Sequence, residues 1–308
     1  EDNAEHGFGM LLGQNAVRNR LIAKVEAIAE SDKASDEIKA AAKAFLDTKD
    51  DVKTNGAAAD ALADAIKDID CADCKDIVEN KEFLSKKSVW IFGGDGWAYD
   101  IGFGGVDHVL ASGENVNIMV FDTEVYSNTG GKASKASQIG QVAQFAAAGK
   151  SIAKKSLAEI AMSYGYVYVA QIAMGANMNQ TIKAIEEAEA YPGPSIVIAY
   201  APCEMHSIKG GMVNCQKEMK RAVECGYWNM FRFNPALKAE GKNPFTIDSK
   251  QPVTEEYRNF LLNEARYSSL TRSFPERAEK LFGEAEVKSV ERYEHLLRLK
   301  DLYAPKAD

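Results

Sequence analysis

The chain has 308 residues, of which 46% are hydrophobic and 27% charged, so it can fold around a large core and wholesale disorder is excluded. Its net charge of −8 argues against binding to nucleic acid or to an anionic membrane surface, because both are themselves negatively charged. The sequence contains no apolar run of the roughly 18 residues that a membrane span needs, and its first residues lack the basic and apolar segments of a signal peptide. Five cysteines, few and odd in number, are typical of a reduced, cytoplasmic protein.

Residues 1–86 form the first predicted segment, and it is helical. Apolar residues recur at helical spacing in VRNRLIAKVEAIAE, EIKAAAKAFLDTK and AAADALADAIKDI, and no strand pattern interrupts them. We interpret the segment as a helical insertion or lid that packs on another part of the protein.

Residues 87–235 form the second predicted segment, in which apolar strands alternate with helices. The predicted strands are SVWIFGG, VNIMVFD, YVYVAQI and PSIVIAYA, and the helical stretches between them are GGVDHVLASG, SLAEIAMSYG and NQTIKAIEEAEAY. This alternation predicts an α/β fold, with a buried parallel sheet and helices on both faces. Ligands of such sheets bind beyond the carboxyl ends of the strands, which here are followed by residues 93–100, 122–131, 173–177 and 201–206.

Residues 236–308 form the third predicted segment, a helical C-terminal extension that packs on the α/β domain. Just before it, QKEMKRAVECGYW predicts a helix and WNMFRFNP a short strand. Within it, EEYRNFLLNEAR, PERAEKLF and SVERYEHLLRLKDLY predict helices.

The first candidate site is the sequence Gly93-Gly94-Asp95-Gly96-Trp97. Glycines after a strand let the backbone approach a ligand closely, and a helix that follows offers free amides to a phosphate. Asp95 would repel a bare phosphate, but it suits a site where Mg²⁺ bridges one carboxylate to a diphosphate. Taken alone, the sequence is equally compatible with a glycine turn closed by an aspartate.

The second candidate site follows the next strand and reads DTEVYSNTGG from Asp122 to Gly131. The hydroxyl of Thr123 and the carbonyl of Val125 are oxygen ligands, and Asn128 offers hydrogen bonds to a diphosphate or a substrate. Loops on two consecutive strands can converge on one metal–diphosphate. A GDG sequence followed by a strand and an asparagine is the diphosphate-binding signature of thiamine-diphosphate enzymes.

A longer stretch carries a closer resemblance. GGDGWAYDIGFGGVDHVLASGENVNIMVFDTEVYSNTGGKASKAS resembles the thiamine-diphosphate domain of pyruvate:ferredoxin (flavodoxin) oxidoreductases. The similarity continues through FAAAGKSIAKKSLAEIAMSYGYVYVA, PGPSIVIAYAPC and GKNPFTIDSKQPV, and it reaches the N-terminal EDNAEHGFGM. Residues 30–80 and the last helix match less well.

The resemblance implies a thiamine-diphosphate-binding fold and a role for each matching residue. Asp95, the Thr123 hydroxyl and the Val125 carbonyl would hold Mg²⁺. Asn128 would be the catalytic residue that faces the pyruvate carbonyl, where a side-chain amide can steady developing charge. The cofactor pocket would comprise Gly94, Asp95, Gly96, Trp97, Ala98, Thr123, Glu124, Val125, Tyr126, Ser127 and Asn128.

Two groups of cysteines have alternative interpretations. The resemblance implies that Cys203, just after the strand SIVIAYA, is one of the four thiolate ligands of a [4Fe–4S] cluster whose other ligands lie outside this chain. The alternative is a lone buried cysteine, and in this chain by itself we expect no intact cluster. Cys71 and Cys74 suggest a metal or redox pair, but two free thiols in a helix are favoured. Cys215 and Cys225 are expected to be packing residues, and none of the four histidines is predicted to be a general base.

The resemblance also implies what a parent enzyme would do. It would decarboxylate pyruvate oxidatively, transfer the acetyl group to coenzyme A, and pass electrons through iron–sulfur clusters to ferredoxin or flavodoxin as a cytoplasmic homodimer. The chain would be the C-terminal, diphosphate-binding half of that active site and inactive without a pyrimidine-binding domain. Three alternatives stay open: a related 2-oxoacid oxidoreductase, a non-redox thiamine-diphosphate decarboxylase subunit, and a non-catalytic interaction fragment.

Overall fold

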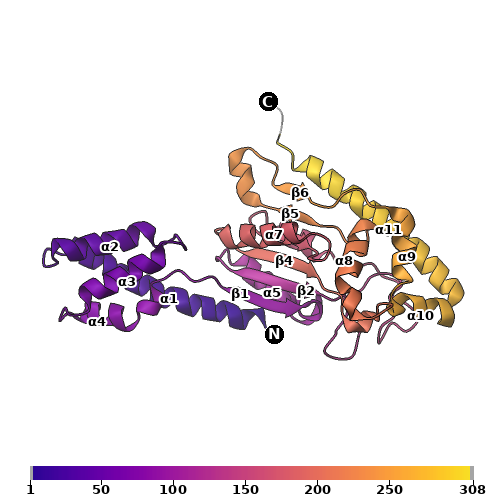
Figure 1. The fold of residues 1–308 in the computed structure, drawn as a ribbon, viewed down its shortest axis with the longest axis horizontal. Helices are drawn as coiled ribbons and strands as arrows, with labels where there is room; N and C mark the ends of the chain where they lie inside the picture. Colours follow the sequence, from indigo (N-terminus) through magenta and orange to yellow (C-terminus); the bar gives the residue numbers. More distant parts are fainter. Residues whose placement is uncertain (1–2, 306–308) are drawn as a thin grey trace. The chain divides into compact units, whose positions relative to one another are not determined.

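The computed structural model describes residues 3–305 and divides them into two compact units (Figure 1). One unit comprises residues 6–89, and the other comprises residues 3–5 together with residues 90–305. The predicted segment boundaries at residues 86 and 235 stay predictions.

The smaller unit is built from helices α1 (Ala4–Glu30), α2 (Asp36–Thr48), α3 (Asn55–Ile66) and α4 (Ala72–Glu79), of which α1 begins in the other unit. Ser35 caps α2 by accepting a hydrogen bond from the backbone N–H of Ile38, which explains where that helix begins. The apolar faces meet in a core of their own, which includes Leu21, Val25, Phe45, Leu62 and Ile77.

The larger unit contains a six-stranded sheet in the order β1-β2-β4-β3-β5-β6. Strands β1 (Trp90–Gly94), β2 (Asn117–Asp122), β3 (Tyr168–Ile172) and β4 (Ser195–Tyr200) are parallel, as the alternation of strands and helices predicts. At one edge the sheet continues with two antiparallel strands, β5 (Phe231–Phe233), which matches the short strand predicted in WNMFRFNP, and β6 (Phe245–Ile247). The sequence pattern does not predict β6, because its two apolar residues, Phe245 and Ile247, lie between turn-forming residues in the sequence NPFTIDS.

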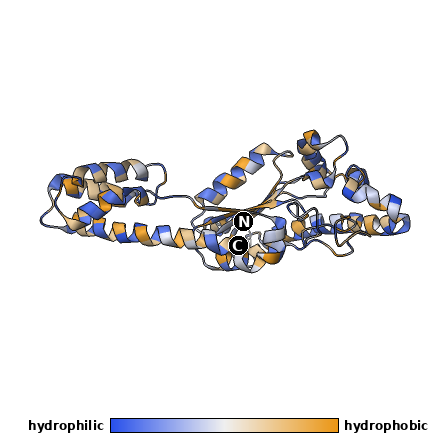
Figure 2. Ribbon diagram, turned by 90° about the horizontal axis from the view of Figure 1, so that it is seen from below, coloured by the Kyte–Doolittle hydropathy of each residue, from blue (hydrophilic) through white to orange (hydrophobic). Residues whose placement is uncertain are grey.

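Helices lie on both sides of this sheet (Figure 2). The central helices are α5 (Phe103–Ala111), α6 (Leu157–Met162) and α7 (Met178–Ala190). Ala184 and Ala188 of α7 pack against Tyr168, Ala170 and Val197 of the sheet, and their small side chains let the helix approach the strands closely.

The remaining helices of this unit are α8 (Cys215–Glu224), α9 (Tyr257–Leu261), α10 (Ala265–Ser273) and α11 (Pro275–Leu302). The predicted helices in PERAEKLF and SVERYEHLLRLKDLY are parts of the single helix α11. This helix begins at Pro275, where proline's missing N–H breaks no hydrogen bond, because the first N–H groups of a helix have no partner within it. No helix within residues 3–305 is both long and apolar enough to span a membrane.

Candidate functional site

The loops that follow β1 and β2 meet at the carboxyl end of the sheet. The two strands are hydrogen-bonded neighbours in parallel register, with Gly94 opposite Phe121, so both chains leave the sheet at the same edge. The chain turns at Asp95 into a π-helical segment, Gly96–Ile101, a geometry that is rare and is found often at functional sites. Between the loops lies a cavity of about 460 Å³, lined by Phe92, Gly93, Gly94, Asp95, Gly96, Trp97, Ile101, Phe121, Thr123, Val125, Tyr126, Ser127, Asn128 and Thr129.

Glycines set the shape of the first loop. The indole of Trp97 lies so close to Gly93 and Gly102 that a Cβ atom on either glycine would be 2.1 to 2.2 Å from a ring carbon. The ring of Tyr126 covers Gly96 in the same way, at 2.5 Å. Gly94 differs, because a Cβ atom there would meet nothing nearer than the Phe121 carbonyl oxygen at 4.0 Å. Gly94 therefore leaves open space in the cavity, whereas its neighbours make room for aromatic rings.

Oxygen atoms of three predicted metal ligands lie together at one end of this cavity. The hydroxyl of Thr123 donates to Oδ1 of Asp95 at 2.7 Å and lies 2.9 Å from the carbonyl oxygen of Val125. Around an octahedral Mg²⁺ with bond lengths of about 2.0–2.1 Å, neighbouring ligand oxygens are about 2.9 Å apart. One carboxylate, one hydroxyl and one carbonyl are also the hard oxygen donors that Mg²⁺ prefers. The residues present therefore fit the ion.

Asp95 is held in an environment that penalises its charge. Its side chain is almost inaccessible, and burial followed by repulsion from Asp122 raises the pKa of Asp95 to about 6. Hydrogen bonds from Ser134 at 2.6 Å and from Thr123 act in the opposite direction. A divalent cation would favour the ionised form, so metal binding and proton release at Asp95 are coupled.

The predicted catalytic residue, Asn128, is exposed at the cavity. Its amide makes no hydrogen bond within the described part of the chain, so it is available to a ligand. The nearby Ser127 hydroxyl lies 2.9 Å from Oγ1 of Thr123, next to the proposed metal ligands.

Two of the predicted cofactor residues, Ala98 and Glu124, do not line the cavity. Both are fully buried. Glu124 adopts a left-handed backbone conformation, φ 59°, and its carboxylate accepts hydrogen bonds from Arg266 at 2.9 Å and from Tyr227. Burial alone would raise the pKa of Glu124, but Lys154 and Arg266 outweigh it and lower the pKa to about 2. Glu124 therefore anchors the second loop to the body of the unit.

Other supporting residues were not predicted from the sequence. Ser134 bonds Asp95, and Lys154 forms an ion pair with Asp122 at 2.7 Å. Nε2 of the fully buried His206 lies 2.6 Å from the carbonyl oxygen of Thr123. Burial, followed by the charge of Arg266, lowers the pKa of His206 to about 3, so its imidazole is neutral and positions the loop. No local pattern marks these residues, because each is distant in sequence from the group that it contacts.

The cysteines lie in different surroundings, and all five are free thiols. Cys203 is half-buried in the loop after β4, and the side chain of its neighbour Met205 covers Gly131 of the second loop. Cys71 precedes the first residue of α4, where the backbone N–H of Cys74 lowers its pKa, whereas burial raises the pKa of Cys74 to about 11. Among residues 3–305, no group of three or more His, Cys, Asp or Glu side chains could hold a metal ion. The proposed Mg²⁺ site is of another kind, with a single carboxylate.

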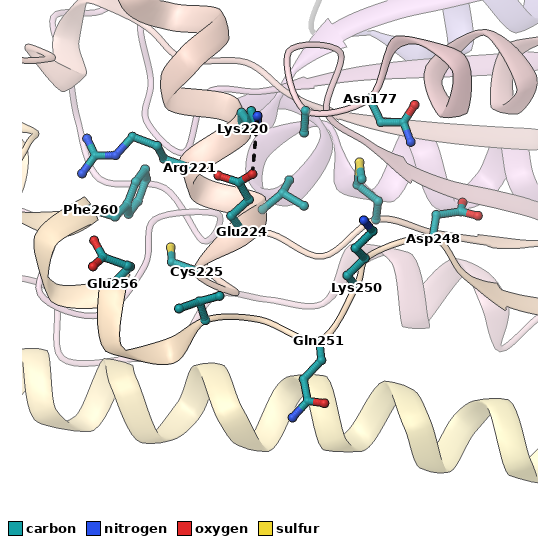
Figure 3. Close-up of a pocket in the computed structure, with 14 residues that line it drawn as sticks. Asn177, Lys220, Arg221, Glu224, Cys225, Asp248, Lys250, Gln251, Glu256 and Phe260 are labelled. Atoms are coloured by element: carbon teal, nitrogen blue, oxygen red, sulfur yellow. Dashed lines mark ion pairs between the residues drawn. The ribbon is translucent and has the colours of Figure 1, made fainter.

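A larger cavity, of about 750 Å³, lies elsewhere in the same unit and contains none of the predicted site residues (Figure 3). Two of its cationic side chains form ion pairs, Lys220 with Glu224 at 3.6 Å and Arg221 with Glu218 at 3.1 Å. The larger cavity therefore lacks the group of oxygen donors from Asp95, Thr123 and Val125 that lies at the smaller one.

Comparisons with known proteins match two regions of different length. Residues 80–199 match the family described as "Thiamine pyrophosphate enzyme, C-terminal TPP binding domain". The pyruvate-flavodoxin oxidoreductase of Klebsiella pneumoniae is 50% identical over 301 residues, which cover 97% of this chain and 26% of that protein. The pyruvate:ferredoxin oxidoreductase of Moorella thermoacetica is 50% identical over 310 residues, which again cover 97% of this chain and 26% of that protein. The chain thus spans about a quarter of the length of these curated relatives.

Among solved structures, a 2-oxoglutarate:ferredoxin oxidoreductase from Magnetococcus marinus overlaps 37% of this chain and 40% of its own, with 25% sequence identity and a TM-score of 0.35.

Proposed function

The chain is related over 97% of its length to the pyruvate:ferredoxin and pyruvate-flavodoxin oxidoreductases, and from this relationship we propose that it is the thiamine-diphosphate-binding portion of such an enzyme. The observation that carries the proposal is the group of oxygens on Asp95, Thr123 and Val125, at the end of a cavity that Gly94 leaves open. This group would hold Mg²⁺, and the ion would bind the diphosphate.

The residues around the cavity would each contribute to binding or to positioning. Gly94 and Gly96 would let the backbone approach the diphosphate, and Trp97 and Tyr126 would form walls that exclude water. The bound cofactor supplies a nucleophilic carbanion for the carbonyl group of a 2-oxo acid. The amide of Asn128 would donate a hydrogen bond to that carbonyl oxygen and would favour the negative charge that develops there.

The cavity is open on a side that exposes aromatic residues, which supports the proposal that this chain forms only part of an active site. Phe92 and Phe121 are 55% and 44% exposed, and their rings stack with centroids 6.1 Å apart. Apolar rings beside a functional cavity are typical of a surface that another domain covers. In the parent enzyme that domain would be the pyrimidine-binding one.

The activity of the whole enzyme is part of the same proposal. It would convert pyruvate and coenzyme A to acetyl-coenzyme A and pass electrons to ferredoxin or flavodoxin, as a cytoplasmic homodimer. Cys203 would be one ligand of a [4Fe–4S] cluster close to the cofactor. Its place beside the second loop supports this role, because Met205 covers Gly131.

The experiment is a thermal melt of the chain with Mg²⁺ and thiamine diphosphate, together and separately. A ligand at about 100 times its dissociation constant adds roughly 2.7 kcal/mol of stability, which raises Tm by several degrees. We expect a shift that needs both components and disappears in Asp95→Ala, because that variant lacks the only carboxylate of the metal site.

The matched control is Asp64→Ala, which removes an exposed carboxylate in the other compact unit. It should keep the full shift. Equal shifts in Asp95→Ala and in the unmodified chain would contradict the metal site. No shift in the unmodified chain would contradict a preformed half-site.

A further inference from the structure

A third cavity, of about 370 Å³, shares no lining residue with the proposed cofactor cavity. It lies between the segment around Lys154, residues 227–229 and helix α11. Its volume is that of a pocket for a small molecule. Nothing in the proposed function uses it.

Four side chains that line this cavity carry a buried nitrogen without a hydrogen-bond partner among residues 3–305. Two of these atoms, Nε1 of Trp228 and Nε of Arg292, can only donate. The other two are amide nitrogens, on Gln138 and Asn229. Trp228, Asn229 and Gln138 are 2%, 3% and 7% exposed. An unpaired buried donor costs free energy, and four around one space indicate a ligand that accepts hydrogen bonds.

The charges around the cavity point to an anion. The guanidinium of Arg292 donates to the backbone oxygens of Gly226 and Tyr227 and is paired with no carboxylate among the described residues. The ammonium group of Lys155 likewise donates to a backbone oxygen, that of Tyr99 at 3.0 Å. Both acidic residues at the cavity already have partners, because Glu291 forms an ion pair with Lys288 and Glu159 is hydrogen-bonded to His295, each at 2.7 Å.

We propose that this cavity binds a small oxyanion, a phosphoryl or carboxylate group of a metabolite, through the N–H groups of Trp228 and Arg292 and the amides of Gln138 and Asn229. The oxygens of such a group only accept hydrogen bonds, which is what unpaired N–H donors require. Its negative charge compensates Arg292 and Lys155. Hydrogen bonds between ionised partners are also shorter and stronger than those between neutral groups.

The test is calorimetric titration of the full chain with inorganic phosphate and, separately, with malonate, against sodium chloride at equal ionic strength. We expect saturable binding of at least one of the two, and the tighter of them identifies the class of group. The test variant is Asn229→Asp, which keeps the shape of the side chain but places a negative charge in the cavity. Because Nδ2 of Asn229 has no partner in the described structure, the change breaks no hydrogen bond. It should weaken binding at least tenfold.

The matched control is Asn177→Asp, the same chemical change in the 750 Å³ cavity of Figure 3. Asn177 caps α7, and aspartate caps helices equally well, so this variant should bind the anion as the unmodified chain does. If Asn229→Asp does not fold by circular dichroism, Gln138→Glu replaces it. The proposal is overturned if neither anion binds saturably, which would mean that the cavity holds water only. It is also overturned if Asn229→Asp binds as tightly as Asn177→Asp, which would place the anion elsewhere.

Discussion

At the scale of single residues, the proposed metal site depends on a carboxylate kept in an unfavourable place. Asp95 is buried and accepts hydrogen bonds from the hydroxyls of Thr123 and Ser134, but it forms no ion pair with any described residue. These hydroxyls and the backbone N–H of Thr123 are three neutral donors, and they offset only part of the effect of desolvation and of repulsion from Asp122, so the pKa of Asp95 is about 6. The ionised carboxylate that the proposed metal site needs therefore lowers the stability of the folded chain when no metal is bound.

The first prediction is that Asp95→Asn stabilises the chain without metal or cofactor at neutral pH. The folded-state pKa of Asp95 is above its unfolded value of 3.8, so ionisation as the pH rises favours the unfolded state. Asparagine has no such penalty. The gain should be near zero below pH 4, grow up to about pH 6 and then level off, with a ceiling of roughly 3 kcal/mol for a shift of about two units. Urea unfolding at several pH values measures it.

The control for this prediction is Asp64→Asn, whose side chain is 77% exposed. Its stability should differ from that of the unmodified chain by the same small amount at each pH. A gain in Asp95→Asn that does not change with pH would show that the substitution acts through packing rather than through charge.

At the scale of elements, the end of β1 and the π-helical segment pack against the same aromatic side chains. The indole of Trp97 lies between Gly93 and Gly102, and Tyr126 from the second loop covers Gly96. The segment is thus held in shape by aromatic rings packed directly on the backbone. Asp95, between β1 and this segment, is positioned by the same packing.

The second prediction separates the structural glycine from the ligand-facing one. Gly93→Ala should destabilise the chain by about 1–3 kcal/mol, because its methyl group would displace the Trp97 ring. Gly94→Ala meets no close neighbour and should leave the free energy of unfolding nearly unchanged. It should nevertheless weaken binding of thiamine diphosphate with Mg²⁺, because the methyl group would occupy the cavity.

Urea unfolding and the thermal melt with cofactor distinguish the two variants. If Gly94→Ala bound the cofactor as well as the unmodified chain, the diphosphate would not lie against this backbone. If Gly93→Ala were as stable as the unmodified chain, the position of the indole would not depend on the glycine.

At the scale of the whole molecule, the chain has separate cores in its two compact units. The core of residues 6–89 contains Phe45 and Leu62, both fully buried. The proposed cofactor cavity and the 370 Å³ cavity, which is proposed to bind an oxyanion, are lined only by residues of the other unit. A substitution that destabilises residues 6–89 should therefore leave ligand binding in the other unit unchanged.

The third prediction tests this separation. Phe45→Ala should cost about 3–5 kcal/mol, because it leaves a cavity in a closed core. Hydrogen exchange followed by mass spectrometry should accelerate within residues 6–89, whereas protection by thiamine diphosphate and Mg²⁺ around Asp95 should persist. The matched control, Phe233→Ala, removes an equally buried ring in β5 and should accelerate exchange within residues 90–305 instead. Equal acceleration in both units by either variant would show one cooperative fold.

The sequence by itself determined the four parallel strands and the two loops at their carboxyl ends. Both are encoded locally, because continuous apolar runs identify buried strands and the residues just after them are the ligand-binding positions of a parallel sheet. These local patterns are enough to place Asp95 and Thr123 together at one edge of the sheet, where the fold indeed brings them into contact. They do not reveal the antiparallel edge strand β6, since its two apolar residues lie between turn-forming residues in the sequence NPFTIDS.

Only the tertiary structure decided which distant residues support the site. Arg266, 142 residues away from Glu124 in the sequence, neutralises its buried carboxylate, and His206 contacts Thr123 from 83 residues away. The four unpaired donors at the 370 Å³ cavity likewise come from distant parts of the chain, residues 138, 228–229 and 292. The physical reason is that buried charges and donors take their properties from whatever the fold places beside them. Packing selects those neighbours in space, whereas the patterns of a sequence describe only neighbours along the chain.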